Sequence, residues 1–125
     1  LDGAPGKITM LYRRDREMVI RVRDLLRAAL PDTLGLSQIA DRLHLSPRTI
    51  HRRLEEEGSS FRAIKDALRR DLALARLTKT RDAIADVAAD LGYADPSAFY
   101  RAFVEWTGMA PVHYRRKWSN TPATG

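Results

Sequence analysis

The sequence contains no cysteine among its 125 residues. Disulfide bonds and zinc sites built from thiolates are therefore excluded, and a reducing compartment such as the cytoplasm is compatible with the chain. No apolar run approaches the ~20 residues that a membrane-spanning helix needs, and the first residues do not follow a signal-peptide pattern. The sequence predicts neither a membrane protein nor a disulfide-stapled one.

Signatures of catalysis are also lacking. The three histidines, His44, His51 and His113, do not show metal-ligand spacing such as i and i+4 on one helix. No glycine-rich phosphate-binding loop is present. We therefore predict that the chain is not an enzyme and that it holds no metal or cofactor.

Basic residues are in excess. The chain has 22 Lys and Arg against 16 Asp and Glu, which gives a formal net charge of +6 and a pI of about 10.2. This surplus suits a polyanionic partner, although it carries no information about the fold. With 44% hydrophobic and 30% charged residues, the composition is typical of globular material that forms one or two small subdomains.

The most informative pattern is a repeat. Its first copy consists of Ile39-Ala40, Leu43, Leu45, Ile50, Arg52 and Leu54, and its second of Val87-Ala88, Leu91, Tyr93, Phe99, Arg101 and Phe103. Ala40 and Ala88 are 48 residues apart, whereas Leu54 and Phe103 are 49 apart, so the second copy has one extra residue in its turn. Each copy has an apolar-faced segment, a tight turn and a second segment with an arginine, which is typical of a helix-turn-helix. Two helix pairs that only pack together, without binding DNA, are the alternative.

The sequence predicts seven helical segments, six of them from apolar residues at helical spacing. They are residues 14–30, 36–43, 47–58, 61–78, 82–91 and 96–108, and a short closing helix that starts at 111. Ser46-Pro47 and Asp95-Pro96 offer helix starts, because a Ser or Asp oxygen accepts an orphan amide and proline fits the first helical position. The expected fold class is all-α.

The two interhelix turns differ at one position. Gly92 follows Leu91 in the second copy, and glycine tolerates the left-handed conformation that a sharp turn often demands. His44 occupies the same position in the first copy. If this position needs a positive φ, the first turn carries backbone strain.

The segment 61–78 contains no glycine or proline and predicts one long helix. At ~1.5 Å per residue it is roughly 27 Å long, on the order of the ~34 Å between successive major-groove sites. We expect it to act as a stiff spacer. The predicted division is a linker at 1–13, a first helix-turn-helix subdomain at 14–59, the linker helix at 60–79, a second subdomain at 80–118 and a disordered tail at 119–125.

Arg52 and Arg101 occupy equivalent places in the two copies. Arginine can donate two hydrogen bonds to the O6 and N7 of guanine when its helix lies in a major groove. We predict both as base-reading residues. The alternative is a surface arginine paired with an acid such as Glu55, Glu56 or Glu105.

Other residues on the same helices are candidates for weaker roles. Arg48 and His51 flank Arg52 as secondary readers, although His51 fits equally well as a solvated histidine. In the second copy Ser97 can meet a base or a phosphate, and Ala98 offers only a methyl contact, for instance to thymine. Candidate phosphate contacts, for which a solvated face is the alternative, are Arg53, Lys65, Arg69, Arg70 and Lys117.

An aromatic series lies within the second copy and ends three residues after it. It consists of Tyr93, Phe99, Phe103 and Trp106. Its helical spacing predicts core packing rather than a platform on which bases stack.

Three stretches resemble the DNA-binding module of AraC/XylS-type bacterial transcription regulators. They are Ile39-Ala40-Asp41-Arg42-Leu43 with Leu45-Ser46, the run from Val87 to Phe103, and Thr107-Gly108-Met109-Ala110-Pro111 with Tyr114-Arg115. The resemblance covers residues 18–116 and is most specific in the second copy. His44, where the family usually has a turn glycine, and the earlier Gly58 depart from the family pattern.

The resemblance implies an all-α module of seven helices, with two homeodomain-like helix-turn-helix subdomains joined by a long helix. It implies that the recognition helices enter successive major grooves of double-stranded DNA at a promoter in the bacterial cytoplasm. The reading residues that it places in this chain are Arg48, Thr49, His51, Arg52, Ser97, Ala98 and Arg101. It also implies RNA polymerase as a partner, and an upstream effector or dimerisation domain that would account for a chain starting at Leu1.

Overall fold

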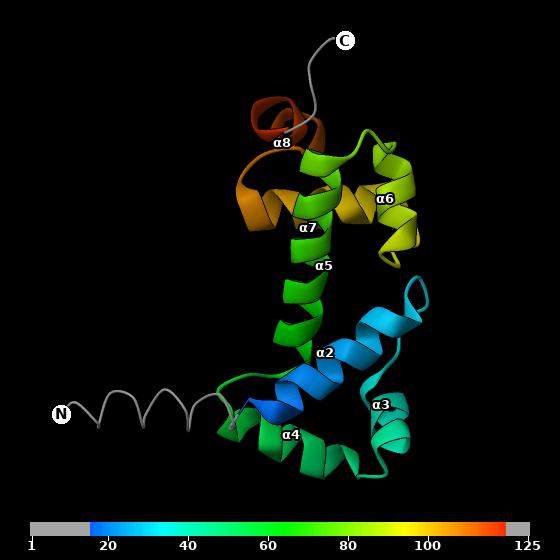
Figure 1. The fold of residues 1–125 in the computed structure, drawn as a ribbon, viewed down its shortest axis with the longest axis vertical. Coiled ribbons are helices and arrows are strands. Elements are labelled where there is room, and N and C mark those ends of the chain that lie inside the picture. The colour runs from blue at the N-terminus through cyan, green and yellow to red at the C-terminus, as the bar shows by residue number, and fades with distance from the viewer. Residues whose placement is uncertain (1–15, 120–125) are drawn as a thin grey trace, which may run out of the picture. The chain divides into compact units, whose positions relative to one another are not determined.

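The computed structural model describes residues 16–119, which contain seven α-helices and no strand. The helices are α2 (Glu17–Ala29), α3 (Leu36–Leu43), α4 (Pro47–Glu56), α5 (Phe61–Lys79), α6 (Ile84–Asp90), α7 (Pro96–Thr107) and α8 (Pro111–Trp118) (Figure 1). The all-α, seven-helix prediction is confirmed. The predicted linker at 1–13 and all but Ser119 of the predicted tail lie outside the described residues. None of the described helices is long and apolar enough to cross a membrane.

The chain divides into two compact units. In the described part, unit 1 contains residues 16–29 and 33–66, and unit 2 contains residues 30–32 and 67–119. The division falls inside α5, whose first six residues belong to unit 1 and whose remainder belongs to unit 2. The continuous helix expected between the two subdomains therefore contributes residues to both.

In unit 1 the helices α2, α3 and α4 pack together, and the first six residues of α5 belong to the same unit (Figure 1). Val22 from α2, Ile39 from α3 and Ile50 from α4 are each fully buried, so all three helices supply one apolar stripe to a common core. The carboxylate of Glu57, directly after α4, accepts hydrogen bonds from the backbone N–H groups of Met18 and Val19 at 2.9 and 2.8 Å. These amides lie in the first turn of α2 and have no partner within that helix.

Unit 2 packs α6, α7 and α8 with the second part of α5 (Figure 1). Ala73 and Leu77 of α5 are buried in one cluster with Val87 of α6 and with Phe99 and Phe103 of α7. The predicted aromatic core is confirmed. Tyr93, Trp106 and Tyr114 pack around it, and the Phe103 and Tyr114 rings meet edge-on at 5.4 Å between centroids.

The two interhelix turns have the same hydrogen-bond pattern. His44 N–H donates to Asp41 O at 3.2 Å and Leu45 N–H to Ala40 O at 3.0 Å. In the second turn Gly92 N–H donates to Ala89 O at 3.0 Å and Tyr93 N–H to Ala88 O at 3.1 Å. This is the Schellman arrangement that ends a helix in a left-handed residue.

His44 occupies the left-handed region with a φ of 58°, and Gly92 has a φ of 91°. The expected strain is therefore present in the first turn, because a Cβ atom disfavours this conformation. The second turn avoids the strain with glycine.

Candidate nucleic-acid interface

The exposed face of α4 is fixed by its buried residues. Ile50 and Leu54 are buried in unit 1, and Ser46 caps the helix by accepting from Thr49 N–H at 3.1 Å. Side chains at i, i+3, i+4 and i+7 share one side of a helix. The exposed side accordingly carries Arg48, His51, Arg52 and Glu55.

Two of these side chains have an acidic partner one turn later. His51 Nε2 lies 3.3 Å from Glu55 Oε2, and Arg52 Nη1 lies 3.6 Å from Glu56 Oε2. The surface pair that the sequence left open for Arg52 is thus present. All four side chains are about 60% exposed, and exposed pairs contribute roughly 0–1 kcal/mol. Arg52 can therefore exchange Glu56 for another hydrogen-bond acceptor at small cost.

Helix α7 presents an equivalent face. Asp95 caps α7 by accepting a hydrogen bond from Ala98 N–H at 3.0 Å. Because Phe99 and Phe103 are buried, the opposite side of α7 lies at the surface. Adding the 49-residue offset of the repeat to the four exposed positions of α4 gives Ser97, Tyr100, Arg101 and Val104, all of them exposed.

Arg101 differs from Arg52 in having no acidic partner. Within residues 16–119 no ion pair is formed between Arg101 and Glu105 or any other acid. Together with Pro96, Ser97 and Tyr100, Arg101 lines a shallow surface hollow. Arg101 is exposed, and among the described residues no acid engages its guanidinium donors, which are therefore open to a ligand.

Thr49 and Ala98 sit at the flanks of the two faces. Both are half-buried, and their backbone N–H groups bond to the caps Ser46 and Asp95. The hydroxyl of Thr49 also accepts a hydrogen bond from Ser46 Oγ at 2.9 Å. Their predicted role as readers stays a prediction.

The candidate phosphate contacts fall into two groups. Arg53 on α4 is exposed, and Lys65 is half-buried on the part of α5 that belongs to unit 1. In unit 2 the Arg69 guanidinium lies 4.5 Å from the centre of the Tyr93 ring, and Arg70 pairs with Asp71 at 3.2 Å. Lys117 lies 5.3 Å from the ring centre of its neighbour Trp118.

Two residues of the exposed α7 face, Tyr100 and Val104, are not among the site residues predicted from the sequence. The signal was available, because Tyr100 is the repeat equivalent of His51 and Val104 that of Glu55. Both are large hydrophobic residues on an amphipathic helix, where such residues ordinarily belong to the core. In the structure 52% of Tyr100 and 36% of Val104 are exposed.

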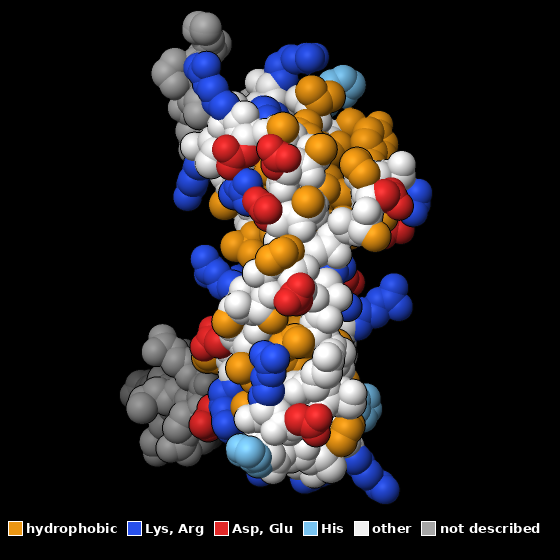
Figure 2. Space-filling model, turned by 90° about the vertical axis from the view of Figure 1, so that its right-hand side faces the viewer, with side chains coloured by type: hydrophobic (Ala, Val, Ile, Leu, Met, Phe, Trp, Pro, Cys, Tyr) orange, Lys and Arg blue, Asp and Glu red, His pale blue; other side chains and the backbone are white. Residues whose placement is uncertain are grey.

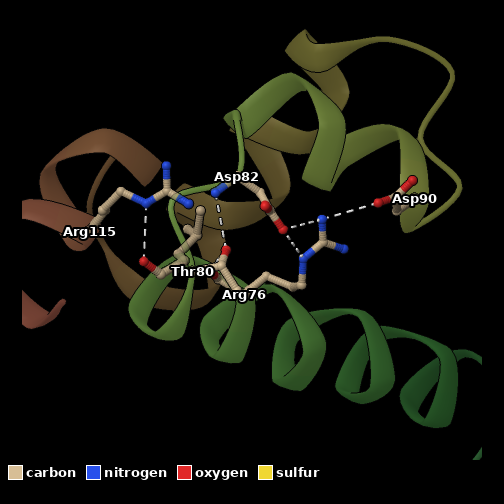
Figure 3. Close-up of polar contacts among 6 residues, drawn as sticks. Arg76, Thr80, Asp82, Asp90 and Arg115 are labelled. Atoms are coloured by element: carbon tan, nitrogen blue, oxygen red, sulfur yellow. Dashed lines mark hydrogen bonds and ion pairs between the residues drawn. The ribbon is translucent and has the colours of Figure 1, made fainter. Parts of the chain in front are cut away.

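A polar cluster holds α6 in place against α5 (Figure 3). Arg76 Nη2 lies 2.8 Å from Asp82 Oδ2 and 3.1 Å from Asp90 Oδ2, at the two ends of α6. Burial opposes the charge of Arg76, but the hydrogen bonds and attraction of the two aspartates prevail and raise its pKa. Arg115 of α8 adds a hydrogen bond from Nε to the carbonyl of Leu77 at 3.0 Å. The Arg76 contacts join α5 to both flanks of α6, the Arg115 contact joins α8 to α5, and none of these residues belongs to the exposed faces of α4 and α7.

The surface is mixed in charge. Figure 2 shows Lys and Arg side chains spread over both units, with acidic side chains between them and more hydrophobic surface on unit 2. The exposed large hydrophobic residues of the described part are Ile20 in unit 1 and Tyr100, Val104, Val112 and Trp118 in unit 2. Across residues 16–119 no cluster of His, Asp and Glu side chains is arranged to hold a metal ion.

Two helix-turn-helix units, each with an exposed arginine on its second helix, are the architecture of a DNA-binding module. Residues 39–117 match the model of a family described as a helix-turn-helix domain. The ornithine utilization regulator of Pseudomonas aeruginosa is 41% identical over 98 residues, which are 78% of this chain and 29% of that protein.

Solved structures agree with this match. The C-terminal domain of AraT, a response regulator from Geobacillus stearothermophilus, has a TM-score of 0.77 and 28% identity, over 87% of this chain and 92% of that one. The DNA-binding domain of AdpA in complex with a target DNA has the same fold, with a TM-score of 0.67 and 24% identity over 83% and 91% of the two chains.

The chain belongs to the AraC-type helix-turn-helix family of DNA-binding transcription regulators. It spans about three tenths of the length of the first curated relatives that it matches.

Proposed function

We propose that the chain binds double-stranded DNA sequence-specifically, with α4 and α7 each inserted in a major groove, in successive turns of the duplex. The observation that carries this proposal is the equivalence of the two exposed helix faces, each centred on an arginine, Arg52 in α4 and Arg101 in α7. An arginine on the exposed side of a recognition helix is placed to donate two hydrogen bonds to one guanine.

The remaining candidates take supporting roles in this proposal. Arg48, His51 and Ser97 contact bases beside the two guanines, and Thr49 and Ala98 line the flanks of the helices. Arg53, Lys65, Arg69, Arg70 and Lys117 contact phosphates, where they add affinity without sequence choice. The net charge of +6 attracts the chain to DNA of any sequence.

For the protein as a whole we propose a regulator that controls transcription at a promoter in the bacterial cytoplasm. An upstream effector or dimerisation domain and contact with RNA polymerase belong to this proposal, supported by the family and by the small share of the relatives' length that this chain spans. The proposed module works by binding alone, without catalysis and without a cofactor.

The test starts from a duplex selected by this chain out of a randomised pool. Arg52→Ala and Arg101→Ala are each expected to weaken binding to the selected duplex by about 1–3 kcal/mol and to relax base preference at one position. Arg53→Ala, an exposed arginine on the flank of α4, is the matched control and weakens selected and random duplexes alike. Equal losses on both duplexes for Arg52→Ala and Arg101→Ala would remove them as base readers.

A salt titration separates this function from that of a helical bundle that binds another protein. Affinity for DNA falls steeply as salt rises, because each neutralised phosphate releases counterions. A shallow dependence on salt would contradict DNA as the partner.

A further inference from the structure

The exposed faces of α4 and α7 have the same geometry but different chemistry. The repeat pairs Arg48 with Ser97 and Arg52 with Arg101, so a polar side chain occupies these positions in both helices. The other two positions diverge. On α4 these positions hold two polar residues, His51 and Glu55, with His51 Nε2 3.3 Å from Glu55 Oε2, whereas α7 carries Tyr100 and Val104 there.

The two apolar groups on α7 are not needed by the core of unit 2. Phe99 and Phe103 fill that core from the opposite side of α7 and are fully buried. Tyr100 and Val104 instead expose 52% and 36% of their surface, next to the exposed Arg101. Burial of this apolar surface is favourable only when the partner also presents an apolar group.

Among the four bases, only thymine presents an apolar group at its major-groove edge, the C5 methyl. The remaining edges offer hydrogen-bond donors and acceptors, which a valine side chain cannot satisfy. Tyr100 and Val104 are four residues apart, which is about 6 Å along a helix axis and close to two base steps of about 3.4 Å. Their contacts therefore fall within a stretch of about three base pairs.

We propose that α7 reads a short stretch of base pairs that contains thymine, which we call the α7 box. In it Tyr100 and Val104 pack against thymine C5 methyl groups, while Arg101 binds an adjacent guanine. The stretch of base pairs read by α4 (the α4 box) should show no such dependence on methyl groups, because the equivalent positions of α4 hold the polar residues His51 and Glu55. This inference rests on the proposed function, because it requires α7 to lie in a major groove.

The probe is the duplex selected by this chain, in which each thymine is replaced in turn by deoxyuridine. This exchange removes one methyl group and leaves base pairing unchanged. The α7 box is identified as the stretch whose base preference relaxes in Arg101→Ala, and the α4 box as the stretch that relaxes in Arg52→Ala. We expect each contacted methyl to contribute about fourfold in affinity, in the α7 box and not in the α4 box.

Three variants assign the methyl contacts to side chains. Val104→Ala and Tyr100→Ala are expected to bind the thymine and uracil duplexes equally at the base that each one contacts. Tyr100→Phe keeps the ring and is expected to retain the discrimination in full. Because both side chains are exposed, the variants are expected to keep the unfolding midpoint of the parent chain.

The outcomes separate this inference from the function on which it rests. The inference is overturned if the α7 box contains no thymine, or if the parent chain binds the thymine and uracil duplexes equally. The proposed function still stands in that case, provided that Arg101→Ala loses its preference for guanine. Equal binding of the thymine and uracil duplexes by Tyr100→Phe, which keeps the ring, would overturn the methyl contact of Tyr100. Failure to select any duplex overturns both proposals.

Discussion

The carboxylate of Glu57 accepts a hydrogen bond from the backbone N–H of Met18 at 2.9 Å, across 39 positions of sequence. Its second oxygen accepts from the next amide along α2 at 2.8 Å. A negative charge at a helix N-terminus satisfies orphan donors and interacts favourably with the helix dipole. Glu57 therefore links the N-terminus of α2 to the C-terminus of α4, the helix that carries Arg52.

Removing this carboxylate is expected to destabilise unit 1. Glu57→Ala leaves two amides of α2 without their partner and should lower the free energy of unfolding by about 1–2 kcal/mol. Urea unfolding followed by circular dichroism measures the loss, and hydrogen exchange at Met18 and Val19 locates it. Glu55→Ala, at an exposed position nearby, is the control and should cost under about 0.5 kcal/mol. Equal losses in the two variants would contradict the capping role.

The left-handed turn residue offers a stabilising change. His44 has a φ of 58°, where the equivalent Gly92 has a φ of 91°. His44→Gly removes the Cβ strain and should raise the stability of unit 1 by about 0.5–1 kcal/mol, net of the extra freedom of glycine in the unfolded chain. Gly92→Ala makes the opposite change in unit 2 and should lower stability. A destabilising His44→Gly would show that the imidazole makes a favourable contribution at this turn.

The Arg76 cluster is expected to determine how firmly α6 is held. Arg76→Met keeps most of the side-chain volume but leaves Asp82 and Asp90 without their shared cation, and should destabilise unit 2 by about 1–2 kcal/mol. Both tryptophans, Trp106 and Trp118, lie in unit 2, so fluorescence reports its unfolding separately from that of unit 1.

The pH dependence of this contribution has a definite sign. Because the pKa of Arg76 is raised in the folded chain, its contribution is fully present below the unfolded-state pKa and is lost only as pH rises through the folded-state value, far above neutrality. The difference in stability between the parent chain and Arg76→Met should therefore not decline between neutral and mildly alkaline pH. A decline there would contradict arginine as its source.

The acids next to Arg52 are expected to weaken DNA binding. Glu56→Gln frees Arg52 from its partner at 3.6 Å and removes a negative charge near the phosphates, so affinity should rise by about two- to fivefold. Asp24→Asn makes the same change in net charge from an exposed position on α2 and serves as the control. Fluorescence anisotropy on the selected duplex measures both, and equal gains would assign the effect to net charge alone.

Much of the fold could be read from local signals. Helices α4 and α7 begin at Pro47 and Pro96, directly after their N-caps Ser46 and Asp95. These starts could be predicted because an N-cap and a proline affect only the first turn of the helix that follows them. The repeat also predicted equivalent turns, and the matching hydrogen bonds of Leu45 and Tyr93 confirm it. Short-range patterns of this kind do not depend on the rest of the chain.

The contacts that hold the helices together could not be read in the same way. Nothing in the sequence near Glu57 connects it to Met18, and nothing near Arg76 selects Asp90 among the acids of the chain. Such pairs arise only when helices that are distant in sequence pack side by side. The exposure of Tyr100 also depends on this packing, because an aromatic residue on an amphipathic helix is ordinarily buried in the core.

The amino-acid sequence alone determined the seven helices, the duplicated helix-turn-helix and the two arginines at equivalent positions, because capping, helical periodicity and repeat spacing are local properties of the chain. The tertiary structure decided which side chains around those arginines face solvent. Burial depends on the packing of all helices in a unit. It leaves Tyr100 and Val104 exposed beside Arg101 on α7, whereas the exposed Arg52 of α4 pairs with Glu56. The chemistry of each exposed face follows from that packing.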